Sequence, residues 1–258
     1  MNTVWKIVLG MATLTVWAPA GAVGRMVDLT VYDRTSQQPL PIYRHDGRYY
    51  VAGQPGHRYQ IQLRSREGGR TLDVLSVDGV NVLSGDTADW SQTGYVLDPF
   101  VATDIRGWRK SLSEVADFVF SDASRSYAAQ TGRPDNIGVI GMAVFRARPL
   151  PMPMPVRPMV EESSGAPADQ MRQAPAAPAP AAKALSAMGG PIGTGHGARE
   201  TSVVSYTDFE RASATPDDVV TLYYDTRERL IAQGVIPSPE RSPTLPDPFP
   251  GHFVPDPH

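Results

Sequence analysis

The feature that most constrains the fold is a pair of short apolar segments joined by Asp78-Gly79. The segments LDVLSV at 72–77 and VNVL at 80–83 contain many of the branched residues that favour β-strands. A two-residue Asp-Gly loop suits a type I′ turn, because glycine adopts positive φ without strain and the turn matches the twist of paired strands. The sequence therefore predicts a β-hairpin over residues 71–83.

Short segments with alternating polarity recur around this hairpin. Val27, Leu29 and Val31 share one face of segment 26–32, and residues 57–63 alternate in the same way. This alternation is typical of antiparallel strands with one buried face. Further strands are expected at residues 49–51, 95–97, 101–105, 118–120 and 139–145, with short helical turns at 111–115 and 126–130. About eight short strands without a long amphipathic helix predict an all-β fold, an antiparallel β-sandwich or jelly roll with short helical turns.

The amino terminus has the pattern of a cleavable export signal. Lys6 precedes an apolar run at 7–17, which is too short to cross a hydrocarbon core of about 30 Å. Small residues at 18–22 suit the cleavage site, so residues 1–22 are expected to be a signal peptide and the mature protein periplasmic or secreted. The chain contains no cysteine, which excludes a lipoprotein anchor, disulfides, a thiol nucleophile and thiolate metal ligands.

Proline and glycine divide the rest of the chain. Most of the 25 prolines follow residue 148. We expect a β-sandwich domain at 23–148, a flexible Pro/Ala/Gly-rich linker at 149–199, a β-β-α segment at 200–236 and a disordered proline-rich tail at 237–258. The β-β-α segment, with strands expected at 201–209 and 218–224, is too small to be stable alone and is expected to dock on the sandwich or on a partner.

Five short segments resemble an uncharacterised family of exported proteobacterial proteins with a β-sandwich-like domain. They are SVDGVNV at 76–82, GYVL at 94–97, GWRKS at 107–111, GVIG at 138–141 and GTGHG at 193–197. The resemblance implies export and an ordered region on each side of the linker. It carries no known activity to transfer.

The motifs of common catalytic and metal sites are not matched. Histidine pairs with the spacing of zinc proteases and a Gly-x-Ser-x-Gly elbow are both missing, and the glycines at 193–197 lack the lysine and following helix of a P-loop. Four acidic residues, Asp73, Asp78, Asp86 and Asp89, cluster without the spacing of an EF-hand, so a calcium site there stays open. We otherwise expect no catalytic residues, no cofactor and no metal site.

Aromatic residues and one arginine are the best candidates for contact with a ligand. Trp90, Tyr95 and Trp108 can stack on sugars or on partner side chains, and Arg109 supplies directional hydrogen-bond donors. The alternative is that Trp108 belongs to the core and Arg109 to a solvated strand end. The net charge of −3 gives no electrostatic case for nucleic acid.

These observations predict an exported binding or assembly module of the cell envelope without catalytic activity, acting through the sandwich surface. Its partner would be a protein or glycan of the envelope, with no nucleic acid and no stable membrane insertion. Two alternatives remain: a carbohydrate-binding module that uses Trp90, Trp108 or Tyr95, and an envelope hydrolase with an unrecognised site.

Overall fold

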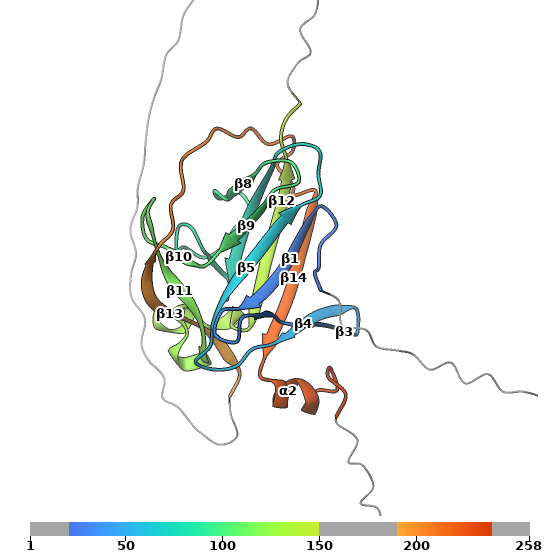
Figure 1. The fold of residues 1–258 in the computed structure, drawn as a ribbon, viewed down its shortest axis with the longest axis vertical. Helices are drawn as coiled ribbons and strands as arrows, with labels where there is room; N and C mark the ends of the chain where they lie inside the picture. Colours follow the sequence, from blue (N-terminus) through green and yellow to red (C-terminus); the bar gives the residue numbers. More distant parts are fainter. Residues whose placement is uncertain (1–20, 150–189, 239–258) are drawn as a thin grey trace, which may run out of the picture.

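Two packed β-sheets form the body of the protein (Figure 1), as seen in a computed structural model that describes residues 21–149 and 190–238. The expected all-β, sandwich-like class is confirmed. The expectations for the signal peptide, for most of the linker and for nearly all of the tail fall on residues 1–20, 150–189 and 239–258, which lie outside the described residues.

Each sheet has seven strands. The first sheet contains β1 (Val27–Asp33), β2 (Gln38–Pro39), β5 (Arg58–Ser65), β9 (Ala102–Ile105), β10 (Gly107–Arg109), β11 (Glu114–Asp122) and β13 (Ile192–Thr201). The second contains β3 (Ile42–His45), β4 (Arg48–Ala52), β6 (Thr71–Val77), β7 (Val80–Asn81), β8 (Tyr95–Leu97), β12 (Val139–Arg146) and β14 (Asp218–Asp225). Short helical turns are η1 (Ala123–Arg125), α1 (Tyr127–Gln130), η2 (Pro134–Asn136) and α2 (Arg227–Ala232). The turn expected at 126–130 corresponds to α1, but the helical turn expected at 111–115 is wrong, because residues 111–113 form a bend that leads directly into β11.

The strand order explains which segments meet. The first sheet runs β10-β11-β5-β1-β2, with β13 also on β11 and β9 also on β5. The second runs β3-β4-β14-β12-β6-β7, with β8 also on β6. The pairing of β14 with β4 is parallel, so the second sheet is mixed rather than purely antiparallel.

The core lies between the sheets and follows the predicted alternation. Val27, Leu29 and Val31 of β1 are fully buried, while the residues between them are half-buried. Tyr59 stacks on Phe120 at a centroid distance of 4.2 Å. Burial of each large apolar side chain contributes about 1.5–3 kcal/mol, so this alternation is the main source of stability.

The Asp-Gly hairpin is confirmed, with a shorter second strand than expected. Asp78 and Gly79 have φ of 53° and 73°, as a type I′ turn requires, and Val77 pairs with Val80. The second strand ends at Asn81 because its side-chain oxygen accepts a hydrogen bond from the amide of Leu83 at 2.8 Å. This Asx-type contact turns the chain out of the sheet.

The glycines at 193–197 belong to a strand, which corrects their assignment to the flexible linker. β13 pairs with β11 along nearly its whole length. A Cβ on Gly193 would lie 2.6 Å from Cβ of Ser126, and one on Gly197 would lie 2.7 Å from Cγ2 of Val119. The glycines therefore permit close approach of neighbouring chain segments, a role that glycine can take inside a strand.

The expected strand at 201–209 is also corrected. Beyond the end of β13, residues 202–217 form an extended connection, here called the strap, that arches over one end of the sandwich to β14 (Figure 1). Val203 and Tyr206 are 76% and 89% exposed, whereas Val204 and Phe209 pack against the two core clusters of the sandwich. β14 then enters the second sheet between β12 and β4, and Val220, Leu222 and Tyr224 join the main core.

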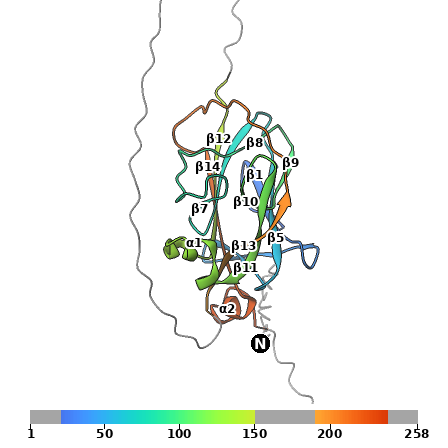
Figure 2. The same ribbon diagram turned by 90° about the vertical axis from the view of Figure 1, so that its left-hand side faces the viewer.

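Helix α2 docks against the second sheet. Leu230, Val235 and Ile236 are buried together, with Tyr43 and Tyr50 packed against them. The helix begins after Thr226, whose hydroxyl accepts a hydrogen bond from the Arg229 amide. The preceding residue, Asp225, accepts a hydrogen bond from the Arg229 guanidinium at 2.7 Å. Figure 2 shows α2 at the end of the sandwich opposite the strap.

Candidate functional site

A cavity of about 900 Å³ lies beneath the strap. Its walls come from the start of β6, from β8 and the loop before it, from β10 with the turn after it, and from strap residues 204–211. These four segments are distant in the sequence. They meet because the strap crosses from β13 of the first sheet to β14, which lies between β12 and β4 of the second.

Arginine side chains hold the strap over the cavity. Arg109 donates to the carbonyl of Ser202 at 2.5 Å, and Arg70 donates to Oγ1 of Thr207 at 2.8 Å. Arg211, on the strap itself, donates to the carbonyl of Trp90 at 2.8 Å. Its guanidinium also lies 4.1 Å from the centroid of the Phe145 ring. The strap is thus fixed by hydrogen bonds to backbone and hydroxyl oxygens and by one cation–π contact.

Three polar atoms in the cavity wall are buried without a hydrogen-bond partner among the described residues. They are Nε of Arg70, which lies 3.5 Å from Oδ1 of Asp98, and a neighbouring pair, the hydroxyl of Tyr95 and Nε of Arg109. Burial raises the pKa of Tyr95, whereas the charge of Arg109 and a hydrogen-bonding contact with its guanidinium lower it. The two groups are therefore neighbours, although neither the Tyr95 hydroxyl nor Arg109 Nε makes a hydrogen bond of full geometry. A buried polar group without a partner costs about 1–3 kcal/mol, so this pair is an energetic liability of the unliganded fold.

The charged residues of the cavity lining are mainly cations. In the described part of the chain they are Arg70, Arg109, Lys110 and Arg211, against the single carboxylate of Asp98. Asp98 lies 3.5 Å from Nε of Arg70. Within residues 21–149 and 190–238, no carboxylate forms an ion pair with Arg109, Lys110 or Arg211. The cavity therefore has an excess of positive charge.

Neighbouring groups only partly offset the cost of burying these cations. Burial lowers the pKa of Arg211. Burial also lowers the pKa of Lys110, and the nearby charge of Arg199 lowers it further. Lys110 lies 5.2 Å from the centroid of the Tyr127 ring, which stabilises the ammonium weakly. A lowered cation pKa means that the charged form is less stable here than in water.

The structure divides the four residues selected from the sequence. Tyr95 and Arg109 both line the cavity. Trp90 lies just outside it, 54% exposed, in the loop whose next residue, Ser91, is part of the wall. Trp108 is 2% exposed and its indole N–H donates to the carbonyl of Gly195 at 3.2 Å, so it belongs to the core and we remove it from the candidate site.

Sequence reasoning missed Arg70, Lys110 and Arg211 as members of the site. Arg70 and Arg211 lie about 140 residues apart in the chain, and the strap that joins them to one cavity differs from the strand expected at 201–209. Lys110 follows Arg109 directly and has no sequence signal of its own. No local pattern distinguishes these residues from other surface cations.

A second group of polar residues is buried in the core. The hydroxyl of Tyr224 donates to Oδ1 of Asp78 at 2.5 Å and lies 2.7 Å from Oγ1 of Thr194. Oδ2 of Asp78 accepts from the Thr194 amide at 2.7 Å, and Oδ1 also accepts from the Gly138 amide at 2.9 Å. The hydroxyl of Tyr59 lies 2.6 Å from Oγ1 of Thr194.

This network is structural. Its members are almost fully buried and use their polar atoms on one another. Burial raises the pKa of Asp78 despite these hydrogen bonds, and it raises the pKa of Tyr59 and of Tyr224 well above the ordinary value. The network joins three of the segments noted in the sequence, at 76–82, 138–141 and 193–197, and it ties β13 and β14 to the rest of the sandwich.

The acidic cluster does not form one site. Asp73 is buried between the sheets, Asp78 belongs to the core network, and Asp86 and Asp89 are exposed. In residues 21–149 and 190–238 no group of three or more His, Asp or Glu side chains is arranged to hold a metal ion. Across the same ranges, none of the helices has the length and apolar character needed to cross a membrane.

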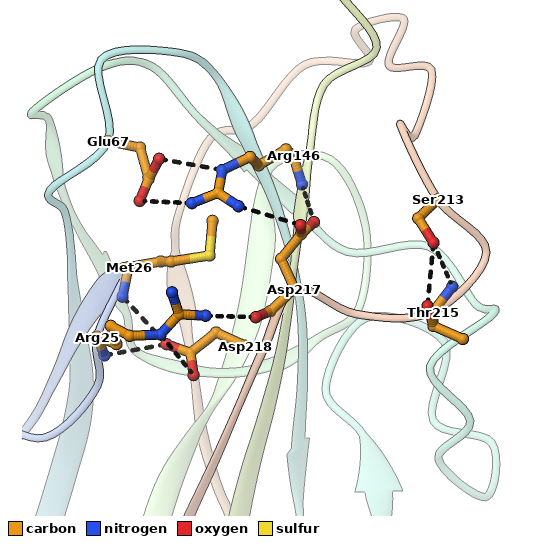
Figure 3. Close-up of polar contacts among 8 residues, drawn as sticks. All are labelled: Arg25, Met26, Glu67, Arg146, Ser213, Thr215, Asp217 and Asp218. Carbon is orange, nitrogen blue, oxygen red and sulfur yellow. Dashed lines mark hydrogen bonds and ion pairs between the residues drawn. The ribbon is translucent and has the colours of Figure 1, made fainter.

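Charged residues at the far end of the strap have a different role. Arg146 forms ion pairs with Glu67 and Asp217, and Asp218 accepts hydrogen bonds from the amides of Arg25 and Met26 (Figure 3). Each charge in this group has a partner of opposite sign or a backbone donor. The group therefore fastens the strap to the sandwich and offers no free charge to a ligand.

Comparison of the chain with protein-family models, with curated proteins and with solved structures finds no match.

Proposed function

We propose that this protein is an exported ligand-binding module without catalytic activity, and that its ligand occupies the cavity beneath the strap. The observation that carries the proposal is the pair of buried, unpartnered donors in the cavity wall, the Tyr95 hydroxyl and Arg109 Nε. Folded proteins rarely leave such groups unpaired, and binding sites are among the places where they do. A bound polar group would satisfy both.

The shape of the site favours a small ligand or the end of a longer chain. A volume of about 900 Å³ lies within the usual range for small-molecule pockets. A stable protein–protein contact instead needs a broad patch of about 800 Å² on each partner. The proposal therefore narrows the sequence-based expectation of a binding or assembly module towards binding.

The lining supports binding rather than catalysis. General acid–base chemistry needs a titratable group that can exchange a proton near neutral pH. Among the described residues of the lining, Asp98 is the one carboxylate, 3.5 Å from Nε of Arg70, and no histidine contributes to the walls. An envelope hydrolase is therefore the weaker alternative at this cavity.

A carbohydrate is the favoured class of ligand. The exposed ring of Trp90 beside the cavity and the exposed ring of Tyr206 on the strap can stack on a sugar that enters from solvent. Exported proteins meet the glycans of the cell envelope, which agrees with the export signal expected at residues 1–22.

The test is a panel of envelope glycans and small polar metabolites, read by tryptophan fluorescence of the mature chain, with Trp90→Phe to assign the signal. Ser205→Phe adds a ring to the cavity wall, and Ala214→Phe adds the same ring to an exposed strap position outside the cavity. We expect a ligand that binds the wild type and Ala214→Phe and is lost in Ser205→Phe. A ligand that binds all three alike, or a panel without any response, would overturn the proposal.

A further inference from the structure

We infer that the cavity recognises an anionic group, a carboxylate or a phosphate, through Arg109 and Tyr95. This inference rests on the proposed function and adds the charge of the ligand to it. A neutral polar ligand would satisfy the two unpartnered donors, but it would leave the positive charge around them uncompensated.

Other arginines of the protein form ion pairs with carboxylates. Arg34, which is also partly buried, pairs with Asp117 at 2.9 Å and with Glu200 at 2.7 Å. Arg146 likewise pairs with two carboxylates. In the described part of the chain, Arg109 and Arg211 have backbone or hydroxyl oxygens as their acceptors and no carboxylate. The cavity is thus a place where several partly buried cations converge without counter-ions.

The available donors suit one oxyanion. The terminal nitrogens of Arg109 are engaged with Ser202 and Ser111, which holds the guanidinium in place and leaves Nε–H free. The Tyr95 hydroxyl adjoins the same guanidinium. An N–H of a cation and a neighbouring O–H can donate together to one carboxylate or phosphate, and charge-assisted bonds of this kind are the stronger ones. Lys110 and Arg211 add long-range attraction.

Acidic residues in the wall do not offset the positive charge of the cavity. Asp98 is the one acidic side chain of its wall, and its charge is opposed by Arg70. An anion that enters would therefore meet a net positive surface. Its binding would also raise the pKa of Lys110, because a nearby negative charge stabilises the ammonium.

The experiment compares three probes of similar size: glucuronate for a carboxylate, glucose 6-phosphate for a phosphate, and glucose as the neutral control. Affinities are measured by calorimetry on the mature chain at low salt. We expect at least one anionic probe to bind at least about tenfold more tightly than glucose, and to weaken when salt is raised to about 200 mM. The probe that binds identifies the source of the charge.

Variants locate the interaction. Tyr95→Phe removes a hydroxyl whose contact with Arg109 falls short of a full hydrogen bond, so the fold is expected to persist while anion affinity falls several-fold. Arg109→Gln should reduce it about tenfold or more, because charge-assisted hydrogen bonds are the stronger class. Arg44→Gln, at an exposed position of β3, is the matched control and should bind like the wild type.

The outcomes separate the two proposals. Equal affinity for glucose and both anions, with loss in the Ser205→Phe variant, overturns the anion assignment and leaves the cavity as a neutral-ligand site. No binding of either anion also overturns it, while the panel of glycans and metabolites decides the proposed function separately. Anion binding that is the same in Tyr95→Phe, Arg109→Gln and Arg44→Gln places the anion elsewhere and refutes the inference.

Discussion

Asp73 makes a strong prediction about pH and stability. Its side chain is fully buried between the sheets, Oδ1 has no hydrogen-bond partner among the described residues, and the Thr71 hydroxyl lies 3.5 Å from Oδ2. Burial raises the pKa of Asp73 from 3.8 to about 7, and the weak bond from Thr71 opposes this only slightly. The carboxyl is therefore protonated in the folded protein at pH values where it is ionised in the unfolded chain.

The sign and size follow from proton linkage. Below about pH 4 the carboxyl is protonated in both states and carries no penalty. As the pH rises towards 7, the unfolded state releases its proton first, so the free energy of unfolding falls. The difference between 3.8 and about 7, at about 1.4 kcal/mol per pKa unit, corresponds to about 4 kcal/mol, lost by the time the pH passes 7. That is a large part of the 5–15 kcal/mol typical of a folded domain.

The perturbation is Asp73→Asn, which cannot ionise. Urea unfolding at about pH 4, 6 and 8, followed by the fluorescence of buried Trp108, measures the free energy of unfolding of both proteins. We expect little difference at pH 4 and an Asn variant more stable by several kcal/mol at pH 8. Working with the difference between the two proteins removes the contribution of other titrating groups. Asp86→Asn, at an exposed position, should show no such trend. A stability difference for Asp73→Asn that does not change with pH would refute the reasoning.

Two further predictions test the core network and the glycine strand. Tyr224→Phe removes the hydrogen bond to Asp78 and should lower the free energy of unfolding by about 1–3 kcal/mol in urea titrations, whereas Tyr223→Phe, on the opposite face of β14, should change it far less. Gly193→Ala places a methyl group 2.6 Å from Cβ of Ser126 and should cost about 1–3 kcal/mol in thermal or urea unfolding; an unchanged midpoint would show that the glycine is not needed for close approach.

Local features of the sequence were sufficient for much of the fold. The period-two alternation of β1 and β5 needs only neighbouring residues, and it predicted their buried faces correctly. The turn at Asp78-Gly79 depends on the φ values of two residues, so it too could be read directly. The hydroxyl cap of α1 by Ser126 is a contact over three residues and was within reach for the same reason.

Only part of the candidate site could be predicted from the sequence. Tyr95 and Arg109 could be selected because an aromatic ring and a guanidinium are common in binding sites. Their neighbourhood could not be read, because it depends on the path of a strap that begins more than ninety residues later in the chain. From the sequence, Trp108 and Trp90 are equally good candidates for stacking on a ligand. The packing of the sandwich alone decides that Trp108 is buried and Trp90 is exposed.

The sequence by itself determined most of the strands before residue 149, the tight turn and the all-β class, because turn geometry and side-chain alternation are properties of adjacent residues. The tertiary structure alone decided that the glycines at 193–197 form a strand, that β14 enters the second sheet beside β12, and that four cations surround one cavity. Without knowledge of the packing, a glycine-rich segment is interpreted as flexible. Once the neighbouring segments are in place, the same glycines are seen to allow two chain segments to approach closely. Charge has the same dependence: a cation is ordinary on a solvated strand end and becomes a binding group only when the fold withdraws it from water without a carboxylate to pair with it.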